Sequence, residues 1–127
     1  MLGSIREATV RVAGIQLDVI WEDPAANLAR VEPRVAEAAA AGARLVALPE
    51  MFATGFSMAS VEMAAHAEAI RSVVAALARR HRIWLLAGYA EPGAERPYNA
   101  CSLVDPDGAE ALHYRKLHPF SLAGEHE

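Results

Sequence analysis

The sequence has little of several features that identify particular classes of protein. Its 127 residues include one cysteine, so no disulfide can form within the chain and the cysteine framework of a small secreted module is missing. No apolar run reaches the roughly 18 residues of a membrane span. Residues 1–10 also lack the basic and apolar regions of a signal peptide. These absences predict a soluble protein in a reducing, cytoplasmic setting.

Positive charge is scarce as well. Twelve Lys and Arg residues stand against 16 Asp and Glu residues, and the formal net charge is -4 at pH 7. The basic residues are dispersed, which gives little support for binding the phosphates of a nucleic acid. The five histidines show no paired ligand spacing, and there is no glycine-rich phosphate loop or nucleophile-elbow serine. We therefore predict no nucleic-acid or membrane partner, no metal and no cofactor.

Hydrophobic residues are plentiful, at 54% of the chain, and charged residues make up 22%. A chain of this size and composition buries roughly two-thirds of the surface that it exposes when unfolded. No repeat, low-complexity tract or linker interrupts it. We expect residues 1–127 to form a single domain.

The first half of the chain alternates strand and helix signals. Residues 9–17 are rich in β-branched residues, and residues 43–48 form a short apolar run typical of a strand covered on both faces. Between them, Asp23 before Pro24 marks the start of a helix over residues 24–41, which Gly42 ends. Pro33 lies inside this helix and is a candidate kink.

The second half repeats the pattern and then changes it. An Ala-rich helix is expected over residues 60–80, a buried strand over 83–87 and a loop over 88–97. The DPDG sequence of residues 105–108 is a turn signal between strand-like segments, residues 99–104 and 109–114. The order predicts an α/β fold with parallel strands first and an antiparallel hairpin later.

Glu50 is the first candidate for a chemical role. It follows the apolar strand of residues 43–48, and active-site groups of α/β sheets gather at the carboxyl ends of strands. Leu48, Met51 and Phe52 would desolvate its carboxylate and make it a better proton acceptor. The alternative is an ordinary solvated Glu at the end of a strand.

Lys116 is the second candidate, because the segment HYRKLHPF crowds cationic and titratable groups beside aromatic ones. A desolvated ammonium group can stabilise an oxyanion, whereas alternating charges on an edge strand discourage aggregation. From this segment alone the edge-strand interpretation is favoured.

The remaining candidates have simpler explanations. Cys101 lies within the strand segment NACSLV, where a free Cys usually behaves as a small buried hydrophobe, so we do not assign it as a nucleophile. Glu125 and Glu127 close the chain, where a frayed acidic terminus is the default interpretation.

Four segments taken together resemble the nitrilase superfamily of carbon–nitrogen hydrolases, in the same order along the chain. They are VRVAGIQLD, RLVALPEMFATGF, YNACSLVDPDG and HYRKLHPFSLAGEHE. The most specific parts are LPEMF around Glu50 and YRKLHPF around Lys116. The segments GFS and AGEHE are similar to sequences of the ω-amidase-like branch. The resemblance implies that residues 1–127 are the N-terminal part of an αββα sandwich.

The resemblance also implies catalytic roles. Glu50 corresponds to a general base, Lys116 to the group that stabilises the tetrahedral intermediate, and Glu125 to a second Glu that positions the substrate and the Lys. Glu127 is the alternative match for that second Glu. A Cys of the family attacks the carbon of a small amide or nitrile, and the complete protein is expected to form a homo-oligomer.

That Cys follows the Lys and the second Glu on a later strand of the family, so we expect this sequence to lack the nucleophile and to be inactive alone. An alternative is a noncatalytic interaction module that retains the first half of the family's fold. The glutaminase-like and acyltransferase branches are a third possibility, which the sequence does not distinguish from amide hydrolysis.

Overall fold

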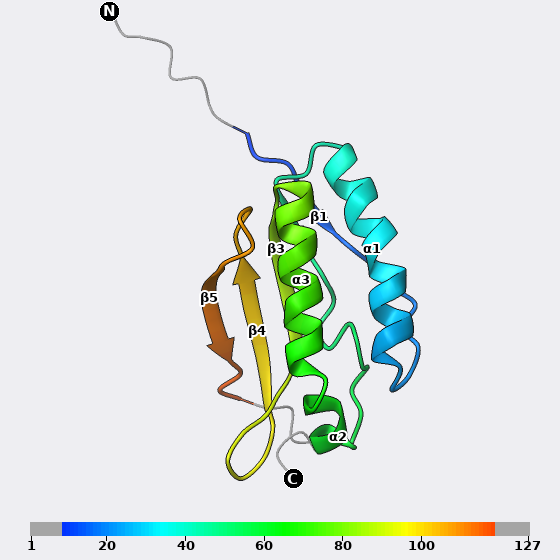
Figure 1. Cartoon of the computed structure of the whole chain (residues 1–127), viewed down its shortest axis with the longest axis vertical. Helices are drawn as coiled ribbons and strands as arrows, with labels where there is room; N and C mark the ends of the chain where they lie inside the picture. The colour runs from blue at the N-terminus through cyan, green and yellow to red at the C-terminus, as the bar shows by residue number, and fades with distance from the viewer. Residues whose placement is uncertain (1–8, 119–127) are drawn as a thin grey trace, which may run out of the picture.

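The computed structural model describes residues 9–118, which form a five-stranded sheet with two long helices on one face (Figure 1). The sheet order follows the chain, with β1 to β3 parallel and β4 and β5 added antiparallel. The predicted α/β architecture is confirmed. The elements are β1 (Val12–Gly14), α1 (Pro24–Ala40), β2 (Leu45–Ala47), α2 (Ser60–Ala64), α3 (Ala67–His81), β3 (Trp84–Glu91), β4 (Tyr98–Val104) and β5 (Glu110–Arg115).

Helix α1 begins and ends where its sequence signals lie. The Asp23 side chain accepts a hydrogen bond from the backbone N–H of Ala26 at 3.0 Å, and Pro24 is the first helical residue. Gly42 has a φ of 88°, a left-handed conformation that glycine adopts without strain, and it follows the last turn. Pro33 lies inside the helix without ending it.

Two expected boundaries were wrong. The predicted helix of residues 60–80 is two helices, α2 and α3, separated at Ala65 and His66. The break lets α2 bury Met63 and Ala64 in a small cluster with Met51 and Ala90, while α3 packs on the main core. Strand β3 continues through the predicted loop to Glu91, because its second half pairs with the start of β4.

The core lies between the sheet and the helices α1 and α3. On the opposite face of the sheet no long helix packs among residues 9–118 (Figure 1). The strand register places Val12, Leu112 and Tyr114 on that face, and all three are largely exposed. The core includes Val31 and Val35 of α1, Ile70, Val74 and Leu77 of α3, and Val46, Leu85 and Ala87 of the sheet.

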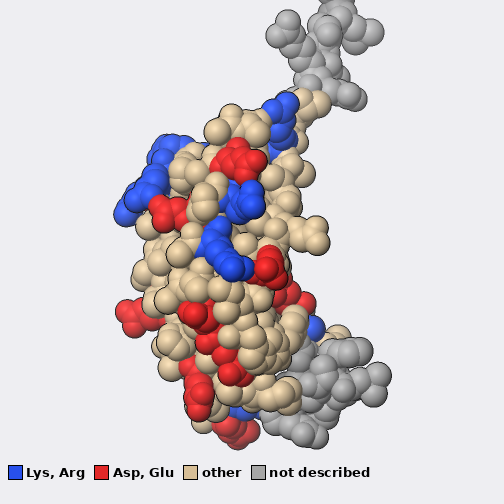
Figure 2. Space-filling model, turned by 90° about the vertical axis from the view of Figure 1, so that its right-hand side faces the viewer, with Lys and Arg blue, Asp and Glu red and all other residues tan. Residues whose placement is uncertain are grey.

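The surface seen from the α1 side carries both signs of charge (Figure 2). Basic side chains there lie beside acidic ones and are separated by uncharged residues, so this face has no continuous basic surface. Several of the charges are paired, such as Arg34 with Glu37 at 3.2 Å and Arg30 with Asp18 at 3.5 Å. Exposed pairs of this kind stabilise a fold by at most about 1 kcal/mol each.

Asn27 is a fully buried polar residue that connects α1 to two loops. Its Oδ1 accepts a hydrogen bond from the N–H of Ile20 at 2.8 Å, and its Nδ2 donates to the carbonyls of Ile20 at 2.7 Å and Ala53 at 2.8 Å. Ala53 belongs to the loop that follows β2. Asn27 therefore fixes this loop against the helix layer.

We expect Asn27→Ala to lower the free energy of unfolding by about 1–3 kcal/mol, because the buried carbonyl of Ala53 and the partly buried N–H and carbonyl of Ile20 lose their partner. Urea denaturation followed by circular dichroism measures the change. Arg34→Ala, an exposed change on the same helix, is the matched control and should stay within about 0.5 kcal/mol of the unmodified chain. Equal losses in the two variants would show that Asn27 does not hold the loop.

Candidate functional site

Three polar side chains meet at one edge of the sheet, although they come from distant parts of the sequence. Glu50 lies in the turn that follows β2, Asn99 lies near the start of β4, and Lys116 directly follows β5. Because β4 runs antiparallel to β3, its start lies at the carboxyl end of the parallel strands, and the end of β5 returns there. The topology thus gathers all three at the edge where ligands of α/β sheets usually bind.

One carboxylate oxygen of Glu50 holds the other two residues. Its Oε1 accepts a hydrogen bond from Asn99 Nδ2 at 2.7 Å and an ion-paired hydrogen bond from Lys116 Nζ at 3.1 Å. Asn99 also fixes the backbone of Lys116, since its carbonyl accepts from the Lys116 N–H at 2.8 Å. Oε2 of Glu50 takes no part in these hydrogen bonds.

Gly88 of β3 determines how closely Glu50 approaches the sheet. A Cβ at position 88 would lie 3.5 Å from both Glu50 Cα and Met51 N, so the loop carrying Glu50 rests directly on this strand. Met51 has a φ of 52°, a left-handed conformation that turns the chain immediately after Glu50. A side chain longer than a methyl group at position 88 would push Glu50 away from Lys116.

The expected desolvation of Glu50 by its sequence neighbours was wrong. The Glu50 side chain is 49% exposed and that of Lys116 is 29% exposed. Phe52 is buried in the main core and Met51 in a separate apolar cluster, so both point away from the carboxylate. Since water screens the Glu50–Lys116 pair, it adds little to stability.

Cys101 lines the same cavity as Glu50 and Lys116, a space of about 360 Å³ on the uncovered face of the sheet. Cys101 lies within β4, as the sequence predicted, but it is half-buried and not fully buried. Burial, and to a lesser degree the negative charge of Glu50, raise the pKa of the Cys101 thiol. A reactive cysteine needs a lowered pKa, so this environment disfavours the thiolate.

The cationic and titratable side chains near Lys116 lie on both faces of β5. His113 Nε2 donates to Glu91 Oε2 at 2.8 Å and Arg115 Nη2 donates to Glu91 Oε1 at 2.5 Å, on the side of the helices. The hydrogen bond from Arg115 is the main reason that the pKa of Glu91 is lowered. The edge-strand interpretation thus fits His113 and Arg115, whereas Lys116 contacts Glu50 on the other face.

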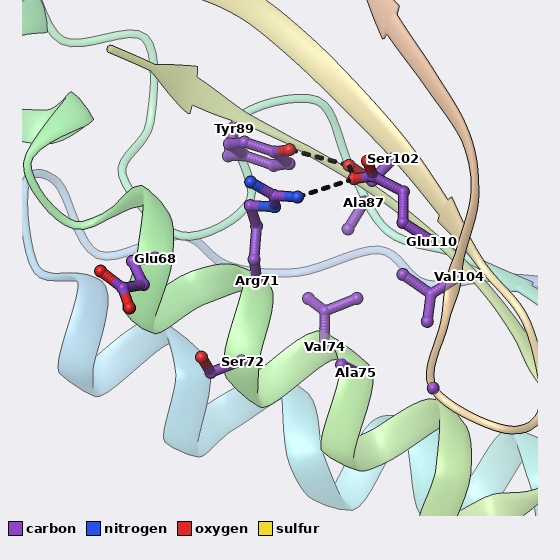
Figure 3. Close-up of a pocket in the computed structure, with 11 residues that line it drawn as sticks. Glu68, Arg71, Ser72, Val74, Ala75, Ala87, Tyr89, Ser102, Val104 and Glu110 are labelled. Atoms are coloured by element: carbon purple, nitrogen blue, oxygen red, sulfur yellow. Dashed lines mark hydrogen bonds and ion pairs between the residues drawn. The ribbon is translucent and has the colours of Figure 1, made fainter.

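A second cavity, of about 300 Å³, lies on the helix side between α3 and the hairpin (Figure 3). The buried Tyr89 hydroxyl and Ser102 Oγ are 2.7 Å apart, and Ser102 donates to Glu110 Oε2 at 2.6 Å. Arg71 of α3 reaches the same carboxylate oxygen at 3.3 Å. Burial raises the pKa of the Tyr89 phenol. This network ties the hairpin to α3, on the face opposite Glu50.

Sequence reasoning missed Asn99, although it lies in the quoted segment YNACSLV. An amide in a strand carries no distinctive signal, and only the pairing of β3 with β4 shows that it faces Glu50. Glu125 and Glu127 lie outside the described residues, so their assigned roles stay predictions.

Among residues 9–118 there is no group of three or more His, Cys, Asp or Glu placed to hold a metal ion. In the same range, no helix is long and apolar enough to cross a bilayer.

Comparison with known proteins gives consistent matches. The model of the carbon–nitrogen hydrolase family matches residues 11–127. The chain is 35% identical to omega-amidase NIT2 of Mus musculus over 91% of its own length, and 32% identical to a bromoxynil-specific nitrilase of Klebsiella pneumoniae subsp. ozaenae over 89%. It spans 42% and 37% of these two relatives.

Solved structures agree with this match. An amidase from Nesterenkonia sp. superposes with a TM-score of 0.82 at 28% identity, over 91% of this chain and 46% of that one. A carbon–nitrogen hydrolase from Helicobacter pylori has a TM-score of 0.81 at 20% identity, over 89% of this chain and 41% of that one, which supports the fold alone. The chain therefore has the fold of the N-terminal part of these enzymes.

The position of Cys101 gives a test of the site's electrostatics. Glu50→Gln keeps the shape of the side chain but removes the charge that raises the Cys101 pKa, so the pKa should fall and more thiolate should form at a given pH. We expect alkylation by iodoacetamide at pH 8.5 to accelerate about two- to threefold, as for the loss of one partly screened charge. Because Cys101 is the only cysteine, mass spectrometry follows it directly.

Glu32→Gln, on the exposed surface of α1, is the control and should leave the alkylation rate unchanged. If Glu50→Gln left the pH profile of alkylation unaltered, Glu50 and Cys101 would not share the cavity as described.

Proposed function

This chain belongs to the carbon–nitrogen hydrolase family, and from that premise we propose that it is the N-terminal part of an amidase that hydrolyses small amides through a Cys, Glu50 and Lys116. The observation that carries the proposal is the contact of Lys116 Nζ with Glu50 Oε1 at 3.1 Å, between residues 66 positions apart. A base and a cation held together at the carboxyl edge of a sheet suit a reaction that moves a proton and creates an oxyanion.

In the proposed reaction, the carboxylate of Glu50 first removes the thiol proton. The thiolate attacks the amide carbon, and a C–S bond forms as the carbonyl becomes an oxyanion. The ammonium group of Lys116 stabilises that charge while keeping its own proton. Glu50 then gives its proton to the nitrogen, the C–N bond breaks, and ammonia leaves a thioester.

Hydrolysis of the thioester repeats the same roles. Glu50 takes a proton from water, the resulting hydroxide attacks the thioester carbon, and Lys116 again stabilises the oxyanion. The C–S bond breaks, the acid is released, and the proton held by Glu50 restores the thiol. A single carboxylate thus serves as the base of both half-reactions, which explains why it must remain accessible.

The nucleophile in this proposal is a Cys other than Cys101, carried by the complete enzyme on a later strand. The raised pKa of Cys101 and its place inside a paired strand both argue against an activated thiolate there. Glu125 is proposed to position Lys116 and the substrate. We expect the chain alone to be inactive on these grounds.

Small amides are the substrate class that the relatives favour. The relative from Mus musculus is an omega-amidase, and the Nesterenkonia amidase has been solved with butyramide. The Klebsiella pneumoniae relative is a nitrilase, so attack on a nitrile carbon is the alternative chemistry at the same three groups.

A noncatalytic role is the second candidate. Its support is the sheet face that no long helix covers in the part of the chain that the structure describes. Val12, Leu112 and Tyr114 are exposed on that face, and exposed apolar surface often marks an interface. A stable oligomer of the 127-residue chain, measured by sedimentation, together with no effect of Glu50→Gln in any catalytic assay, would favour this role.

We expect the chain alone to release no ammonia from butyramide, whereas the chain joined to the unmatched C-terminal part of the Nesterenkonia amidase should do so. In that fusion, Glu50→Gln and Lys116→Met should each lower kcat/KM by about 10²–10⁴ and Cys101→Ser should not. A coupled ammonia assay measures turnover, and circular dichroism verifies folding. Turnover by the chain alone that Cys101→Ala abolishes would mean that the nucleophile has been misplaced.

A further inference from the structure

Asn99 is the one of the three polar residues at the candidate site whose backbone lies within a strand. It belongs to β4 and pairs with Ala90 of β3. On the other side of β4, its carbonyl accepts a hydrogen bond from the N–H of Lys116 at 2.8 Å. Glu50 lies in a turn and Lys116 follows the end of β5. The backbone of Asn99 is therefore held from both sides, whereas its two partners lie outside the strands.

The two hydrogen bonds to Glu50 Oε1 differ in character. Asn99 Nδ2 donates at 2.7 Å from a short side chain, and Lys116 Nζ donates at 3.1 Å from a long and flexible one. Because Glu50 is 49% exposed, water screens its attraction to Lys116. The hydrogen bond from Asn99 is the shorter one, and hydrogen bonds depend strongly on their angle. Asn99 therefore supplies the direction that the screened ion pair lacks.

The other neighbours of Glu50 do not orient its carboxylate. Met51 and Phe52 are buried in two different apolar clusters, away from the carboxylate. Gly88 lets the backbone of Glu50 approach β3 closely, but it has no side chain to touch the carboxylate. Within the described part of the chain, the hydrogen bonds to the Glu50 side chain come from Asn99 and Lys116.

We propose that Asn99 is a positioning residue, whose carboxamide orients the Glu50 carboxylate and whose carbonyl fixes the strand end that carries Lys116. The proposal rests on the proposed amidase function and adds a residue to its site. A single position of β4 thus sets the base and the cation relative to each other. The reaction depends on this setting, since a misplacement of about 1 Å in a reacting group can lower the rate about 10²-fold.

Loss of the carboxamide should lower kcat and leave KM almost unchanged, because Asn99 acts through Glu50 and not on the substrate. Leu has nearly the shape of Asn but no hydrogen-bond donor. In the fusion to the C-terminal part of the Nesterenkonia amidase, Asn99→Leu and Asn99→Ala should each lower kcat for butyramide about 10- to 100-fold, with KM within about threefold. A coupled ammonia assay measures both constants, and circular dichroism verifies folding.

A double substitution separates positioning from a general effect on the fold. With Glu50→Gln already present, Asn99→Leu should lower kcat less than about twofold, because the carboxylate that Asn99 orients is gone. A residue that only stabilises the fold would cause the same loss in both backgrounds. Ser102→Ala is the matched control, since it removes a hydrogen-bonding side chain from the opposite face of β4. It should lower the free energy of unfolding and leave kcat unchanged.

An NMR measurement on the 127-residue chain tests the contact without turnover. Lys116 is the only lysine, and the side-chain carboxamides are those of Gln16, Asn27 and Asn99. With [ε-¹³C]lysine and ¹⁵N labelling, Glu50→Gln should shift the Lys116 signal and the Asn99 carboxamide signals, but not those of Asn27. Asn99→Leu should shift the Lys116 signal in the same direction as Glu50→Gln does, because the ion pair loosens in both.

Each other outcome overturns the inference. A higher KM with unchanged kcat would mean that Asn99 contacts the substrate, and equal losses in both backgrounds would mean that it serves the fold alone. A Lys116 signal that Asn99→Leu leaves in place would mean that the ion pair keeps its geometry unaided. If the unmodified fusion shows no turnover, the proposed function fails, and the NMR measurement decides whether Asn99 holds Glu50 against Lys116.

Discussion

Gly88 of β3, Cys101 of β4 and Tyr114 of β5 lie side by side across the sheet, and this register determines which face each neighbouring residue occupies. A slip by one residue in β5 would turn Lys116 to the helix side and bring Arg115 to Glu50. The pairing of β4 with β5 shifts by one residue between Leu103 and Val104, where β5 contains an extra residue. The pairs near Lys116 follow this shift along β5, so their register depends on it. Every contact of the candidate site depends on this alignment.

Local signals in the sequence were sufficient for part of the fold. Asp23 and Gly42 bound α1 because capping depends on residues next to one another, and the DPDG turn closes the hairpin for the same reason. The extension of β3 to Glu91 had no local signal, since it depends on pairing with β4. The break between α2 and α3 also escaped prediction, because an Ala-rich segment suits a helix throughout and only packing divides it.

The candidate site was less predictable than the fold. Taken alone, Lys116 was better explained as an edge-strand charge, and only the resemblance to a family paired it with Glu50. Asn99 had no signal at all, although its side chain and backbone connect the other two residues. The desolvation expected for Glu50 failed because adjacent residues in a turn point in different directions. Contacts between distant segments thus carry the information that the residues alone lack.

Strand β5 is bound on both of its faces near its end, although it is the last strand of the sheet that residues 9–118 form. Arg115 pairs with Glu91 on one face and Lys116 with Glu50 on the other. Rotation of the strand about its own axis would lengthen one of these pairs whichever way it turned. The two ion pairs therefore resist rotation of the β5 backbone in opposite directions. Because the backbone is restrained in this way, the long side chain of Lys116 takes a defined position without being fully buried.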